Sequence, residues 1–204
     1  MNRIKLKYVL LVIIAAGIAG LAWYVLDRGF SARTPPSSVE AWIARQLRHI
    51  AIPRSARDAK NPVPASSETL SEAMAHFADH CATCHANDGT GKTDIGQGLY
   101  PKPPDMRQSE TQRLSDGELF YIIHNGVRFT GMPAFGEEAG NGNDEDSWKL
   151  VQFIRHLPNI TAEELQQMEK INPKSPAELE EEEEIRRFLS GDDSPPSAGS
   201  HHHH

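Results

Sequence analysis

A single Cys-x-x-Cys-His motif is the feature that most constrains this chain. It reads "HCATCH" over residues 80–85, and Cys81 and Cys84 are the only two cysteines among 204 residues. Such a motif can bind zinc, form a redox-active dithiol or carry a covalently attached haem. A structural zinc site usually takes four Cys or His ligands from two clusters, so the lack of a second cysteine pair disfavours zinc.

The residues before the motif distinguish the other two chemistries. Residues 67–80 have apolar side chains at helical spacing, and Ser67 or Ser71 can cap this helix. A redox dithiol instead follows a strand and opens a helix, where the helix dipole activates the thiolate. The motif therefore predicts one haem c, with both thiols bonded to its vinyl groups and His85 close enough to bind iron.

An uncharged apolar run near the N-terminus predicts a membrane anchor. Residues 8–26 are 19 residues without a charge, and as a helix they span about 28 Å, close to the hydrocarbon thickness of a bilayer. Arg3, Lys5 and Lys7 precede the run, so the positive-inside rule keeps the N-terminus in the cytoplasm. A cleaved signal peptide is the alternative, although its apolar region is normally shorter. We expect residues 1–28 to form a single-pass anchor in the bacterial inner membrane, with the rest on the periplasmic side.

Charge is unevenly distributed along the chain. The formal charge is −7 in total and +3 over residues 1–28, which leaves −10 for the remainder. Nucleic acid is disfavoured as a partner of such a surface.

Residues 29–66 predict a linker that contains one amphipathic helix. Residues 39–50 carry an apolar stripe at helical spacing. The stripe consists of Val39, Trp42, Ile43, Leu47 and Ile50. Because helical stripes are usually buried faces, we expect this one to pack on the haem domain or on a partner subunit. The alternative is an anionic membrane surface, which would attract Arg45, Arg48 and the basic residues that follow.

A compact all-α domain is predicted over residues 67–160. Helical periodicity covers residues 67–80, 115–126 and 144–157, and few segments alternate with the period of a strand. Residues 87–106 are rich in glycine and proline, as expected of a wrapping loop.

The C-terminal part predicts charged helices over residues 161–190 and a disordered tail over residues 191–204. Thr161 and Glu164 form a capping-box pattern at the first of these helices. The acidic run 180–184 is expected to be a solvated helix face, with docking of a basic partner as the alternative. The four terminal histidines could collect copper or nickel ions, or be an expression tag.

We expect the second axial ligand of the haem iron, opposite His85, among the residues that follow the motif. The candidates are His124, Met132, His156 and Met106. Met132 lies in "TGMPAF", residues 130–135, between a glycine that permits a tight bend and a proline that restricts it to extended geometry. Its thioether can then point inward, where it could bind iron, while the alternatives are a core methionine or a histidine ligand.

The unit from about residue 67 to 158 resembles a class I cytochrome c domain. In that family the attachment motif ends the first helix, a loop methionine follows, and the last helix crosses the first. Phe77 matches the aromatic position of the first helix, while Ala73 stands where many members have glycine. Three residues fall where the last helix meets the first: Trp148, Leu150 and Phe153.

The resemblance implies an all-α, cytochrome c-like fold around one covalent haem. Both cysteines of the motif would be covalent anchors, and His85 and Met132 the axial ligands. The resemblance also implies a hydrogen bond from the other nitrogen of His85 to a backbone carbonyl that Pro103 or Pro104 supplies or shapes.

These ligands imply electron transfer rather than catalysis. With His85 and Met132 both bound, iron has no open position for a substrate, and no catalytic triad or second cofactor motif supports enzymology. We expect one-electron transfer with redox partner proteins, as a membrane-tethered periplasmic carrier or as the cytochrome subunit of a respiratory oxidoreductase. The alternative is a gas or peroxide sensor, or an enzyme, in which Met132 is a labile ligand.

Overall fold

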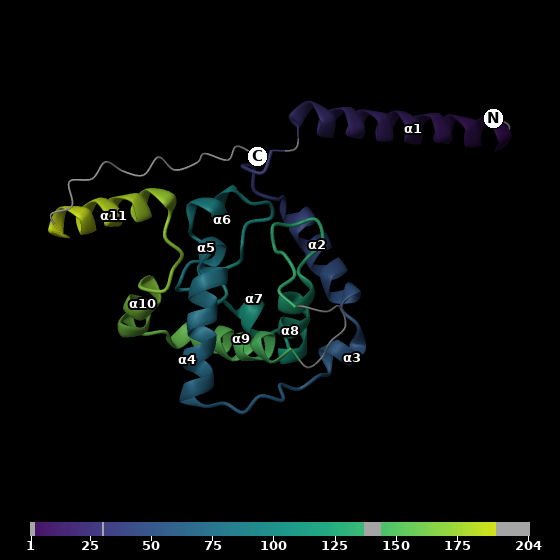
Figure 1. Cartoon of the computed structure of the whole chain (residues 1–204). Helices are drawn as coiled ribbons and strands as arrows, with labels where there is room; N and C mark the ends of the chain where they lie inside the picture. Colours follow the sequence, from purple (N-terminus) through teal and green to yellow (C-terminus); the bar gives the residue numbers. More distant parts are fainter. Residues whose placement is uncertain (1–2, 30, 137–143, 191–204) are drawn as a thin grey trace.

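The computed structural model describes residues 3–29, 31–136 and 144–190, and every regular element in these residues is a helix (Figure 1). The helices are α1 (Arg3–Arg28), α2 (Ser38–Ala51), α3 (Arg54–Arg57), α4 (Ser67–His76), α5 (Ala82–His85), α6 (Asp94–Gly98), α7 (Ser109–Gln112), α8 (Asp116–Asn125), α9 (Glu145–His156), α10 (Ala162–Glu169) and α11 (Pro176–Ser190). A π-helical segment, Phe77–Cys81, joins α4 to α5, and a 3-10 turn, Leu157–Asn159, follows α9. The all-α prediction is confirmed. The predicted disordered tail, with its four histidines, lies outside the described residues.

Helix α1 is one uninterrupted apolar helix. Its candidate membrane span, Lys5–Asp27, has 23 residues, which is long enough to cross a bilayer and slightly longer than the predicted run. The apolar part of this span is not buried against the rest of the described chain. Helix α1 therefore fits a membrane anchor.

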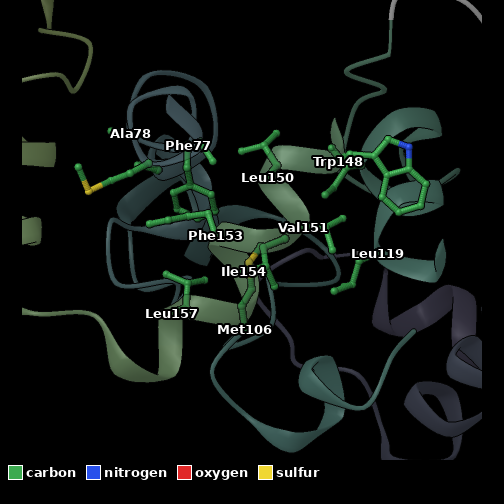
Figure 2. Close-up of a cluster of buried hydrophobic side chains, with 14 of the residues drawn as sticks. Phe77, Ala78, Met106, Leu119, Trp148, Leu150, Val151, Phe153, Ile154 and Leu157 are labelled. Carbon is green, nitrogen blue, oxygen red and sulfur yellow. The ribbon is translucent and has the colours of Figure 1, made fainter. Parts of the chain in front are cut away.

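The centre of the helical unit is the crossing of α4 and α9. Ala73 of α4 is 1 % exposed, so a small residue other than glycine is accommodated in this region. The ring centroids of Phe77 and Phe153 lie 4.9 Å apart in the buried cluster (Figure 2). Trp148 of α9 stacks on Phe120 of α8, with 4.1 Å between the ring centroids, and this contact brings a third helix into the core. The predicted contact between the first and last helices of the unit is confirmed.

The start of α4 differs by one residue from the expected cap. Ser66, rather than Ser67 or Ser71, is the N-cap, because its backbone is extended and its hydroxyl accepts from the backbone N–H of Thr69 at 3.0 Å. Neighbouring serines offer the same hydroxyl, so the local sequence does not distinguish them. The capping box predicted at the start of α10 is confirmed.

Helix α2 forms where it is predicted, but its apolar stripe does not pack on the helical unit. The exposed fractions of the stripe are 67 % for Val39, 58 % for Trp42, 45 % for Ile43, 62 % for Leu47 and 73 % for Ile50. Ala41 and Arg48 are half-buried instead, and Ile52, which follows the helix, is buried. The expectation that the stripe packs on the haem domain of this chain is therefore wrong. The physical reason is that polar contacts at the edge of the stripe, such as His49 with Glu118, hold α2 to the unit with the half-buried Ala41 and Arg48 on the inner side.

Candidate haem-binding site

The two cysteines lie on a fixed helical turn at the end of the first helix of the unit. The N–H of Ala82 donates to the carbonyl of Phe77, five residues earlier, so the helix widens just before the motif. Both thiols are free and half-buried. Burial, with a smaller contribution from Cys84, raises the pKa of Cys81 to about 12. The backbone therefore presents both thiols from ordered helix rather than from a flexible loop.

His85 ends α5 and is buried. Burial lowers its pKa to about 4, so the imidazole is neutral at pH 7 and keeps a lone pair for a metal ion. Its Nδ1 atom is buried without a hydrogen-bond partner in the described part of the chain. Unpaired buried nitrogens are uncommon in folded proteins, so this atom is consistent with a group bound at the ring.

The expected hydrogen bond from His85 to the carbonyl of Pro103 or Pro104 is not formed. The Pro103 carbonyl lies against Gly91 instead, since a Cβ atom built on Gly91 would be 2.7 Å from that oxygen. Gly91 also donates its N–H to the carbonyl of His85 at 2.7 Å. The proline loop thus reaches the segment that follows His85, and Gly91, with a φ of 70°, permits this approach. The sequence does not single out Gly91, whose only signal is its place in a glycine-rich stretch.

Met132 lies in a loop that is bound to the end of α8. The N–H of Val127 donates to the carbonyl of Met132 at 3.1 Å, and the N–H of Phe135 donates to the carbonyl of Ile123 at 3.1 Å. The hydroxyl of Thr130 accepts from the N–H of Met132, also at 3.1 Å. Met132 is half-buried, so the loop offers a thioether from a backbone that hydrogen bonds hold in place.

The other candidate ligands have partners elsewhere in the structure. Nδ1 of His124 lies 2.8 Å from Oδ2 of Asp144, and Nε2 of His156 lies 2.9 Å from Oε1 of Glu164. Met106 is buried in the hydrophobic core, where Figure 2 shows it near Ile154. These contacts favour the loop methionine as the second ligand.

The side chains present fit a covalently held haem. Two thiols at the attachment spacing, a neutral buried imidazole and a thioether are the groups that bind a c-type haem. Over the described ranges, no group of three or more His, Cys, Asp and Glu side chains is arranged to hold a different metal ion.

The fold and these groups define a class I c-type cytochrome domain, an electron-transfer domain whose cofactor is covalently bound haem c. Residues 68–154 match the family model of cytochrome c oxidase, cbb3-type, subunit III. The matched stretch contains the Cys-x-x-Cys-His motif and Met132. No curated protein matches the chain significantly.

Proposed function

We propose that this protein transfers single electrons at the periplasmic face of a bacterial inner membrane, as the haem-bearing subunit of a membrane oxidoreductase. Cys81 and Cys84 would hold haem c covalently, and His85 and Met132 would be its axial ligands. When bound, haem c supplies a reversible one-electron change between ferric and ferrous iron. The observation that carries the proposal is the buried, neutral imidazole of His85 with an unpaired nitrogen, directly after the two thiols.

The surroundings of these ligands favour the reduced state. The Phe77 ring lies 6.5 Å from the His85 ring between centroids, within the apolar core. Apolar surroundings disfavour the additional positive charge of ferric iron, and a neutral thioether from Met132 favours ferrous iron. We therefore expect a reduction potential in the positive part of the haem range.

The connection between anchor and domain supports a fixed subunit over a shuttling carrier. Helix α3 is held to α8, because the Ser115 hydroxyl donates to the carbonyl of Arg57 at 2.7 Å. Gly117 approaches the same segment so closely that a Cβ atom on it would lie 1.8 Å from the carbonyl oxygen of Ala56. Residues 29–37 are then the only tether between α1 and α2, with a reach of about 30 Å at most. A carrier that moves between distant partners needs a longer tether. The name of the matched family, an oxidase subunit, supports the same role.

Spectroscopy of the purified, untreated holoprotein tests the electron-transfer proposal. We expect low-spin, six-coordinate haem in both oxidation states and no change when carbon monoxide is added to the reduced protein. A high-spin, five-coordinate haem that binds carbon monoxide at once would instead support the gas or peroxide sensor.

Gentle extraction of the membranes tests the subunit role. After solubilisation in a mild detergent, the protein is isolated by affinity purification and its size and composition are measured. A complex of fixed stoichiometry with other redox proteins is the expected result. Recovery of the protein alone, with electron exchange in free collision, would favour the carrier.

A further inference from the structure

Helix α2 presents an apolar face that nothing in the described chain covers. Its stripe, Val39, Trp42, Ile43, Leu47 and Ile50, is about half or more exposed at every position. On a helical projection these residues cover one side, and the half-buried Ala41 and Arg48 lie on the opposite side. The orientation is therefore reversed relative to an ordinary surface helix, whose apolar side faces the core.

We propose that this face of α2 lies in the lipid interface beside the anchor, and so fixes the orientation of the cytochrome domain on the membrane. An in-plane amphipathic helix buries its apolar side at the boundary between headgroups and acyl chains, with Trp and basic residues at the headgroup level. The proposal rests on α1 spanning the membrane. It adds to the proposed function a second, peripheral contact with lipid.

The distance to the bilayer supports a lipid occupant. Helix α1 ends at Arg28 and α2 begins at Ser38. The residues between them reach about 30 Å when fully extended, so α2 starts within that distance of the end of the anchor. Figure 1 shows α2 along the outer edge of the helical unit, with its N-terminal end directed towards α1.

The charge distribution supports a lipid surface with anionic headgroups. Residues 29–60 carry six basic and two acidic side chains, a formal charge of +4, whereas residues 61–204 carry −14. Arg45 and Arg54 are exposed in the positive segment. An anionic membrane therefore attracts the segment that contains α2 and repels the rest of the domain, which favours one orientation.

Contacts along α2 make it a rigid part of the domain. Near its start, the hydroxyl of Tyr100 donates to the carboxylate of Glu40. Near its end, Nδ1 of His49 lies 3.1 Å from Oε1 of Glu118, and Nε2 of His49 lies 3.0 Å from Nη1 of Arg57. Because these side-chain contacts tie α2 to α8 and to the proline loop, its insertion into the interface would also set the tilt of the haem-bearing unit.

Spin-label accessibility in the full-length holoprotein tests the proposal. Leu47→Cys places a label in the stripe, and Ala44→Cys places a matched label on an exposed position outside it. Each labelled protein is reconstituted into vesicles of phosphatidylethanolamine and phosphatidylglycerol, without any other protein. We expect the label at position 47 to be several-fold more accessible to oxygen, and several-fold less accessible to a water-soluble nickel complex, than the label at position 44. The haem absorption spectrum reports that each variant is folded.

Two outcomes would overturn the proposal. Equal aqueous accessibility of both labels in vesicles would mean that lipid does not cover the stripe and would favour a partner subunit. Protection that disappears when the protein is diluted in lipid would assign the face to a second copy. Protection that is unchanged in phosphatidylcholine vesicles at high salt would support the lipid contact and assign it to the apolar stripe alone, without a contribution from charge. Failure of the anchor itself is distinguishable, because the protein would then be released from the vesicles by alkaline carbonate.

Discussion

The Nδ1 atom of His124 lies 2.8 Å from Oδ2 of Asp144, and this contact joins the end of α8 to the start of α9. Asp144 also caps α9, because it accepts from the backbone N–H of Ser147 at 3.1 Å and from its hydroxyl at 2.6 Å. The loop that carries Met132 returns to the same place, where the N–H of Gly136 donates to the carbonyl of His124 at 3.0 Å. The His124 and Asp144 pair therefore holds the base of the loop that carries Met132.

Replacement of Asp144 tests the contact between His124 and Asp144 through the pH dependence of stability. Burial opposes ionisation of Asp144, but hydrogen bonds from Ser147 and His124 outweigh it and lower its pKa. A carboxylate with a lowered folded-state pKa adds stability above its unfolded-state pKa, and this stability is lost as the pH falls through the folded-state value. We expect Asp144→Asn to reduce the free energy of unfolding by about 1–2 kcal/mol at pH 7. Denaturant unfolding should show this difference shrinking as the pH falls below about 4.

Asp146→Asn is the matched control for this measurement. Its side chain is 66 % exposed and lies 3.9 Å from Nζ of Lys149. We expect its free energy of unfolding to change by less than about 0.5 kcal/mol, both at pH 7 and below about pH 4. If both variants lost the same free energy of unfolding, the contact between His124 and Asp144 would not have the role described.

Gly91 allows the proline loop to approach the attachment segment. Its φ of 70° is strained for any other L-residue, and a Cβ atom would lie 2.7 Å from the carbonyl oxygen of Pro103. We expect Gly91→Ala to lower the free energy of unfolding by about 2 kcal/mol. Thermal unfolding of the holoprotein measures the loss. Gly98→Ala, where no atom lies within 4 Å of the new Cβ atom, should leave the melting temperature nearly unchanged. Equal effects at the two glycines would contradict this account.

Phe153 of α9 lies at the crossing of α4 and α9, where it packs on Phe77, shortly before the motif. It is fully buried, and its ring lies 4.9 Å from that of Phe77 between centroids. We expect Phe153→Ala to cost about 3–5 kcal/mol of unfolding free energy, because it leaves a cavity where α4 crosses α9. Phe129, which is 95 % exposed, provides the control, and Phe129→Ala should change stability by less than about 0.5 kcal/mol. Chemical denaturation compares the two, and a small loss for Phe153→Ala would show that the crossing does not depend on this ring.

The longer helices could be predicted because their side chains repeat over several turns. Helices α8 and α9 have 10 and 12 residues, enough for the apolar period to be visible in the sequence. Helices α3, α5, α6 and α7 have four or five residues each, about one turn, so no period exists to be read. Whether an apolar stripe is buried cannot be predicted in this way. Periodicity identifies the apolar side of α2, but which side faces the domain depends on partners such as Glu118, far along the chain.

The candidate site also has a part that the local sequence predicts and a part that depends on the tertiary fold. The roles proposed for His85 and the two cysteines follow from a local motif, and the role proposed for Met132 follows from its immediate neighbours and from the family resemblance. The contacts that position these residues join distant segments, as between Gly91 and Pro103. Such contacts depend on the tertiary fold and leave no local pattern. For this reason the expected hydrogen bond of His85 was wrongly predicted. The proline loop is present, but the carbonyl of Pro103 lies against Gly91.

The reduction potential and spin state of Met132→Leu show whether Met132 binds the iron. Leucine has a similar volume but no thioether, so the substitution removes the ligand and preserves most of the packing. Met106→Leu makes the same change in the hydrophobic core. We predict a high-spin spectrum and a clearly lower potential for Met132→Leu, with both properties unchanged in Met106→Leu. A low-spin spectrum and an unchanged potential in Met132→Leu would contradict the assignment of the sixth ligand.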